Sequence, residues 1–147
     1  MDKSNPPTTF GVFKPVGHTL MAFSTEEALQ SAKVALAVQG FGPARLVEYT
    51  PKEMLAQVGA ELQTTSTLAN FGYELDLVRL HKAFAEDGCS FLVVETGDDA
   101  SARLVADLVP ILQPAIAQSY GRFMIEDLTE KLPGRQLDKN ALPSGSL

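Results

Sequence analysis

Two histidines, His18 and His81, and one cysteine, Cys89, are the residues of this chain whose types best suit metal binding or nucleophilic catalysis. Neither histidine has a partner at the HxxxH or ExxH spacings that place two ligands on one helix face. His18 and Cys89 each begin an apolar run, and antiparallel pairing of these runs would separate their first residues by about 20 Å. We therefore expect no metal site, no Cys–His nucleophile and no cofactor. We interpret Cys89 as a buried small hydrophobe and His18 as a capping or surface residue.

Four residues are candidates for a ligand site or an interface: Tyr49, Tyr120, Arg122 and His81. The two tyrosines occupy equivalent positions in an internal repeat, and Arg122 follows Tyr120 in the stretch "SYGR", where it could offer a bidentate donor. His81 lies in a helical stretch. Packing is the interpretation we favour for both tyrosines and for His81, and a ligand site or interface is the alternative.

Acidic residues occur at two expected helix starts, as "STEE" from Ser24 and "TGDD" from Thr96. The first reads as a capping box in which Glu27 reaches back to Ser24, and the second places acids where the helix dipole favours them. "GFGP" from Gly40 follows a helix, so it is a helix stop and turn rather than a phosphate loop. No catalytic residue is assigned.

An internal repeat relates two parts of the chain at an offset of 71 residues. Residues 17–49 match residues 88–120 at 8 of 33 positions, counted without gaps. Ordinary residue usage of about 6% per position would give roughly 2 matches. Each copy reads as a strand, a helix and a second strand.

The repeat predicts the fold class. Strands are expected over residues 18–23, 44–49, 89–94 and in the run from Ala115, with one helix ending at Gly40 and the other near Val109, before Pro110. Two such βαβ units sharing a sheet give a duplicated ferredoxin-like (split βαβ) α+β sandwich, with antiparallel strand order 4-1-3-2 and both helices on one face. A small parallel α/β sheet is the alternative.

Residues 51–87 form a helical insert between the second and third strands. Apolar residues recur at helical spacing in two stripes, which indicates two helices, or one helix broken near residues 64–72. Strands 18–23 and 89–94 are apolar on both faces, so both faces of the sheet should be covered. The insert could cover its own sheet or that of a second subunit.

Domain organisation follows from composition along the chain. Residues 10–130 are expected to form one domain, between a flexible segment of residues 1–9 and a flexible tail of residues 131–147. No run approaches the ~18 apolar residues that would span a bilayer, and the first ten residues lack a signal-peptide core. We therefore expect a cytoplasmic protein without membrane contact.

Charge and strand composition disfavour a nucleic-acid partner. The net charge is −6, whereas nucleic-acid-binding domains usually present a basic face. Ribonucleoprotein-type modules share the ferredoxin-like plan but stack bases on several exposed aromatics. The third strand, "CSFLVVE", offers Phe91 alone.

Three stretches carry a resemblance to a known family: "GHTLMAFSTEEALQSAKVAL", the helical insert and the closing "YGRFMIEDL". Over residues 10–130 the chain resembles general stress protein 17M and related uncharacterised bacterial proteins. The resemblance implies an association with stress, and it carries over no catalytic or binding residue.

These observations favour a non-enzymatic stress-related or regulatory protein that acts through a partner or small ligand and forms a homo-oligomer. The alternative is a small cofactor-independent enzyme of the dimeric ferredoxin-like type, with a pocket against the sheet. A pocket with a perturbed ionisable group would favour the enzyme. A sheet face filled by insert side chains would favour the interaction protein.

Overall fold

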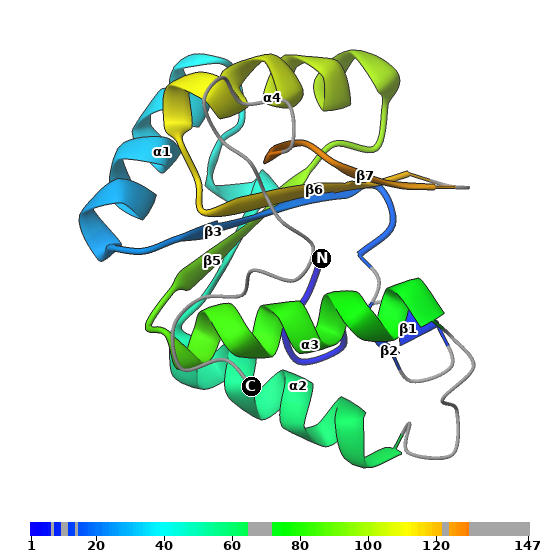
Figure 1. Cartoon of the computed structure of the whole chain (residues 1–147). Helices are drawn as coiled ribbons and strands as arrows, with labels where there is room; N and C mark the ends of the chain where they lie inside the picture. The colour runs from blue at the N-terminus through cyan, green and yellow to red at the C-terminus, as the bar shows by residue number, and fades with distance from the viewer. Residues whose placement is uncertain (7, 10–11, 14, 65–71, 122–123, 130–147) are drawn as a thin grey trace.

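The fold is a five-stranded antiparallel sheet between two layers of helices (Figure 1). The structure is a computed structural model that describes residues 1–6, 8–9, 12–13, 15–64, 72–121 and 124–129. The tail expected over residues 131–147 lies outside the described residues. Among those residues, no helix combines the length and the apolar character needed to cross a membrane.

The main sheet has the order β4-β5-β3-β6-β7, and every neighbouring pair is antiparallel. Its strands, in chain order, are β3 (His18–Phe23), β4 (Leu46–Tyr49), β5 (Ser90–Glu95), β6 (Ile116–Tyr120) and β7 (Ile125–Asp127). A separate two-stranded sheet pairs β1 (Thr8–Thr9) with β2 (Val12–Phe13). The alternative of a parallel sheet is therefore wrong.

The sequence predicted one strand after Ala115, and the structure has two. The chain reverses between β6 and β7 in a tight turn, where the Gly121 N–H donates to the Met124 carbonyl at 2.9 Å. Strand β7 then pairs with the free side of β6, so the sheet has five strands rather than the expected four.

Two helices cover one face of the sheet, called here the outer face. They are α1 (Glu26–Val38) and α4 (Asp99–Leu112), and a short 3₁₀ helix, η1 (Pro43–Arg45), leads from α1 to β4 (Figure 1). The outer core between them and the sheet consists of Met21, Phe23, Leu29, Ala32, Leu36, Phe41, Leu92, Val94, Val105, Val109, Ala117 and Leu128. It contains no ionisable side chain.

The insert covers the opposite face, called the inner face, of its own sheet. It forms two helices, α2 (Pro51–Thr64) and α3 (Gly72–Glu86), on the far side of the sheet from α1 and α4 (Figure 1). The inner core comprises Leu20, Ala22, Tyr49, Met54, Val58, Leu77, Val78, Ala85, Cys89, Phe91, Val93, Ile116 and Tyr120. Successive strand residues point to opposite faces, so strands that are apolar throughout supply both cores.

The helix termini differ from the sequence prediction in two places. The N-cap of α1 is Thr25 rather than Ser24, and the Thr25 hydroxyl accepts from the Ala28 N–H at 3.1 Å. Because the cap is one residue later, Glu27 does not stand three residues after it and the expected capping box does not form.

Helix α4 continues through Pro110, where the sequence predicted its end. A proline in a helix removes one backbone hydrogen bond, because it has no N–H, and its ring crowds the carbonyl four residues earlier. Only Ile111 and Leu112 follow Pro110 in α4, so the helix tolerates this cost in its final turn. The helix ends at Gln113, which adopts φ 51° and donates its N–H to the Val109 carbonyl at 2.9 Å. The end of α1 agrees with the prediction, since Gly40 has φ 97° just beyond it.

The cap of α1 gives a direct test of this correction. We expect Thr25→Ala to lower the free energy of unfolding by about 1 kcal/mol, because the Ala28 N–H loses its acceptor. The neighbouring change Ser24→Ala should stay within about 0.5 kcal/mol of the parent chain. Urea denaturation of both variants makes the comparison, and a larger loss in Ser24→Ala would contradict the assignment.

Candidate functional site

Three polar side chains meet in the inner core and form what we call the inner polar cluster: His81 on α3, with Gln118 and Tyr120 on β6. The His81 Nε2 lies 2.8 Å from the Gln118 Oε1, and the Tyr120 hydroxyl lies 3.1 Å from the same oxygen. The Tyr120 hydroxyl is also 3.5 Å from His81 Nε2. All three are at most 2% exposed, so the cluster joins α3 to the sheet away from solvent.

The hydrogen bonds define which nitrogen of His81 carries the proton. An amide oxygen only accepts, so Gln118 Oε1 receives hydrogen bonds from both His81 Nε2–H and the Tyr120 hydroxyl. A neutral imidazole has one N–H, which leaves a lone pair on Nδ1. That buried Nδ1 has no hydrogen-bond partner among the described residues.

Burial lowers the pKa of His81 from 6.5 to about 4, because desolvation disfavours the charged imidazolium, and the hydrogen bond to Gln118 opposes this effect in part. His81 is therefore neutral near pH 7. Its ring packs edge-on against Phe91, with ring centroids 6.0 Å apart. The neutral ring packs against apolar neighbours, and its polar contacts to Gln118 and Tyr120 are all made through Nε2.

His18 lies on the same inner face as the cluster. Its pairing partners are Tyr120 on β6 and Glu95 on β5, so the three side chains share a face at one end of the sheet. The His18 Nδ1–H donates to the Val16 carbonyl at 3.0 Å. Its Nε2 is buried and has no hydrogen-bond partner within the described part of the chain.

Tyr49 and Tyr120 are both buried in the inner core but do not share a site. Tyr49 pairs with Phe91 on β5, whereas Tyr120 pairs with His18 on β3. Tyr120 is three strands away from Tyr49 across the sheet and four residues further along the strand direction. Together these offsets separate the two Cα atoms by roughly 20 Å. Each therefore belongs to a different corner of the inner face.

The register also corrects which residue is equivalent to Tyr49. The 71-residue offset relates Leu20 to Phe91 (20 + 71 = 91). Phe91 pairs with Tyr49, and Leu20 pairs with Gln118. Gln118 rather than Tyr120 therefore pairs with the residue that the offset matches to the partner of Tyr49, and the pairing differs from the offset by two residues.

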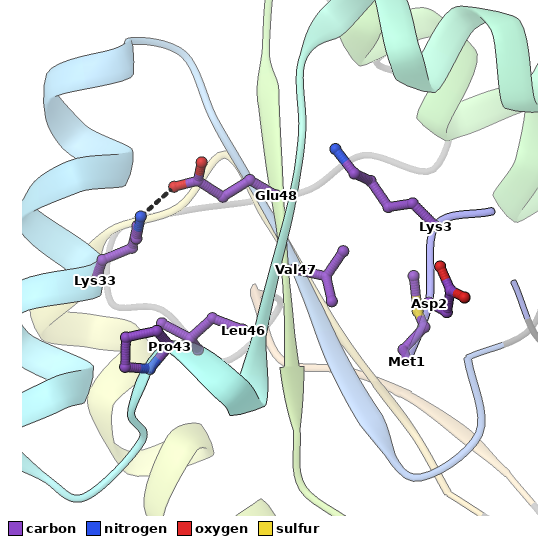
Figure 2. Close-up of a pocket in the computed structure, with 8 residues that line it drawn as sticks. All are labelled: Met1, Asp2, Lys3, Lys33, Pro43, Leu46, Val47 and Glu48. Atoms are coloured by element: carbon purple, nitrogen blue, oxygen red, sulfur yellow. Dashed lines mark ion pairs between the residues drawn. The ribbon is translucent and has the colours of Figure 1, made fainter. Parts of the chain in front are cut away.

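A surface depression of about 480 Å3 lies along the edge strand β4. It is lined by Met1, Asp2, Lys3, Lys33, Pro43, Leu46, Val47 and Glu48. Figure 2 shows that the β4 ribbon separates two groups, with Lys33, Pro43, Leu46 and Glu48 on one side and Val47 with the N-terminal residues on the other. The depression therefore follows the edge of the sheet and reaches both of its sides.

Both lysines that line the depression are paired with a carboxylate. Lys33 Nζ lies 2.6 Å from Glu48 Oε1, and this ion pair links α1 to β4 (Figure 2). Lys3 Nζ lies 2.7 Å from Glu53 Oε2 at the start of α2 and 5.6 Å from the centre of the Tyr49 ring. The lysines are thus neutralised locally and leave Leu46, Val47 and Pro43 as the apolar part of the lining.

The other sequence candidates have structural roles or lie outside the described residues. Arg122 falls in the undescribed residues 122–123. Cys89 is buried, 3% exposed, and burial raises the pKa of its thiol to about 11, with Asp87 adding to the effect. Asp98 accepts from the Ser101 N–H as the N-cap of α4. No group of three or more His, Cys, Asp or Glu side chains in the described ranges could hold a metal ion.

Sequence analysis missed Gln118 and the Lys33–Glu48 pair. Gln118 stands between Ala117 and Ser119 in a strand whose inner positions are otherwise apolar, and a polar residue at such a position was the available signal. The Lys33–Glu48 pair joins α1 to β4 and has no sequence signature.

A scan against protein-family models and searches of curated proteins and of solved structures find no match to this chain.

The inner polar cluster predicts an order of stability losses. Gln118→Leu removes the acceptor of two buried donors and should lower the free energy of unfolding by about 2–3 kcal/mol. Tyr120→Phe removes one donor and leaves Gln118 bonded to His81, so we expect a loss of about 1 kcal/mol. Chemical denaturation at pH 7.5 measures both, and equal losses would mean that Gln118 does not bridge the two donors.

The environment of Cys89 predicts an unreactive thiol. Because the thiol is buried and its pKa is raised, native protein at pH 8 should react with an aromatic disulfide reagent only through opening of the fold. Full reaction within seconds is expected in denaturant. Equally fast labelling of native protein would contradict the described burial.

Proposed function

We propose that this chain is a non-enzymatic binding protein with a regulatory or stress-related role, which acts through an extended segment of a partner at the β4 edge. The carrying observation is that both faces of the sheet are filled by the chain's own helices, while the depression lies at the sheet edge. A partner or small ligand would therefore contact the molecule at β4, beside the start of α2.

The filled inner face argues against the enzymatic alternative. A cofactor-independent enzyme of the ferredoxin-like type would use a pocket against the sheet, and side chains of α2 and α3 such as Met54, Val58 and Leu77 occupy that place. The residue with the most strongly lowered pKa, His81, is enclosed there rather than facing the depression. Chemistry on a substrate needs access that this position lacks.

The arrangement of four strands supports a ferredoxin-like plan. Strands β6, β3, β5 and β4 are successive neighbours, and α1 and α4 lie on the same face of them. The four expected strands, numbered 1 to 4 along the chain, are β3, β4, β5 and β6. Their order in the sheet, starting from β6, is therefore 4-1-3-2, and β7 lies beyond β6. We accordingly describe the chain as a ferredoxin-like sandwich with an extra edge strand and a helical hairpin inserted after β4.

The centre of the sheet supports an origin by duplication. The 71-residue offset makes Met21 and Leu92 equivalent, and these two residues are direct pairing partners. A twofold axis through that pair would exchange β3 with β5 and α1 with α4. The two-residue shift at Gln118 and the added β7 are then later differences between the halves.

The edge of β4 suits an extended segment better than a polyanion. β4 is the last strand at its end of the described sheet, so a further strand could add its backbone to that edge. Apolar side chains of that strand would meet Leu46, Val47 and Pro43. Lys3 and Lys33 are already paired with carboxylates, which disfavours a nucleic-acid partner.

Selection from a random peptide library displayed on phage tests the proposal. Enriched peptides should bind Val47→Lys at least about tenfold more weakly than the parent chain, because a charge is placed in the apolar lining. The matched control is Val34→Lys, since Val34 is 67% exposed on α1 and lies outside the lining. This control should bind as the parent does.

Absence of enriched peptides, or peptides that bind Val47→Lys undiminished, would contradict the proposal. Sedimentation of the parent chain and of Val47→Lys distinguishes a second copy of the chain as the partner, because a homo-oligomer built on β4 would dissociate in the variant.

A further inference from the structure

The α2–α3 hairpin joins two strands that are neighbours in the sheet. Tyr49, the last residue of β4, pairs with Phe91 near the start of β5. The hairpin therefore leaves the sheet and returns to it at adjacent points. Moving it off the inner face would break none of the strand pairings among β4, β5, β3, β6 and β7.

The two cores differ in their content of ionisable groups. The outer layer, under α1 and α4, holds the buried Thr19–Thr96 hydroxyl pair but no buried ionisable side chain among the described residues. The inner core contacts His81, whose Nδ1 is buried and has no hydrogen-bond partner among the described residues. A proton placed on this nitrogen would have no hydrogen-bonded carboxylate beside it among the described residues.

We propose that protonation of His81 releases the α2–α3 hairpin from the inner face, while the sheet and the α1–α4 layer stay folded. In the closed form the proton would sit on Nδ1, beside apolar neighbours and opposite the Nε2–H that already bonds to Gln118. In the released form the imidazolium is hydrated. The regulatory state is thus an open molecule with an exposed apolar sheet face.

The groups that face His81 do not supply a countercharge. From β6 it meets Gln118 and Tyr120, and its partners there are a neutral amide and a neutral phenol. Among the described residues, the other ionisable side chains on the inner face are His18 on β3, Tyr49 on β4, Cys89 and Glu95 on β5, and Asp127 on β7. Asp127 stands opposite Gln118, and its Oδ1 accepts from the backbone N–H and the hydroxyl of Thr129. Glu95 is exposed and stands four residues beyond Phe91, roughly 13 Å along the strand.

Charged residues on the helices themselves point to solvent. On α3 the charged residues whose side chains are described are Asp76, Arg79, Lys82 and Glu86, and they form two exposed pairs, Arg79–Asp76 and Lys82–Glu86. On α2, Lys52 is exposed and Glu53 pairs with Lys3. That exposed pair adds little to holding the hairpin, because surface ion pairs are weak.

The direction and range of the effect follow from proton linkage. The pKa of His81 is 6.5 when hydrated and about 4 in the closed form, so the open form binds more protons. The stabilisation of the closed form is fully present above pH 6.5 and is lost as the pH falls to 4. Closing should be about 30-fold less favourable at pH 5 than at pH 7.5.

Amide hydrogen exchange, corrected for intrinsic rates, tests the proposal on the full chain. Between pH 7.5 and pH 5 we expect protection of residues 77–86 on α3 to fall about 30-fold. Protection in α1 and α4 should change by less than about threefold over the same range. A dye that binds exposed apolar surface should become fluorescent over the same pH range.

Variants at the two histidines identify the titrating group. His81→Gln keeps a donor toward Gln118 but cannot titrate, and His81→Phe keeps the packing against Phe91. Either variant should abolish the pH dependence in α3. His18→Gln, the matched control at the other histidine, should retain it.

Loss of protection in α1 and α4 together with α3 in the parent chain would overturn the proposal, since the transition would then be global. An unchanged acid transition in His81→Gln or His81→Phe, or protection of α3 that is independent of pH in the parent chain, would do the same. Hydrogen exchange of the parent chain alone can overturn the proposal, so the test does not require every variant to fold. None of these outcomes depends on binding at the β4 edge.

Discussion

Burial of the central strands on both faces is the constraint on which the other elements depend. Strands β3 and β5 are paired through six successive residues, and their side chains are apolar on both sides. A pair of this kind is stable only when both faces are covered. The chain supplies α1 and α4 for the outer face and α2 and α3 for the inner face. In the described part of the chain, neither face of the sheet is therefore left open to a ligand. The described depression lies at the edge strand β4, and the polar contacts of the inner face lie beneath α3.

Much of the secondary structure could be predicted because it has local signals. The apolar runs at His18 and Ser90, the positive-φ glycine after α1 and the helical spacing of Met54 and Val58 each act within a few residues. The second strand after Ala115 was missed because its boundary is a tight turn at Gly121, inside a stretch that otherwise reads as one strand. The end of α4 was predicted too early because a proline was taken to stop the helix. The free-energy cost of Pro110 depends on how close it lies to the end of the helix, which the sequence alone does not define.

The candidate site was predictable in part. Tyr49, Tyr120 and His81 are recognisable as residues worth testing, and the structure puts all three on one face of the sheet. Their mutual distances depend on the register of the β6 ladder, which is shifted by two residues relative to the repeat. Gln118 has a sequence signal as a polar residue at an inner strand position, but its contact with His81 depends on tertiary packing that the sequence does not define.

The position of β3 in the sheet has a consequence for synthesis on the ribosome. This strand comes early in the chain, at residues 18–23, yet its two partners are β5 at residues 90–95 and β6 at residues 116–120. An emerging nascent chain therefore holds a strand whose last four residues are apolar without a partner until most of the protein has been translated. Long-range closure of this kind slows folding and exposes aggregation-prone surface, so shielding by a chaperone during translation would matter most for the segment from His18 to Phe23.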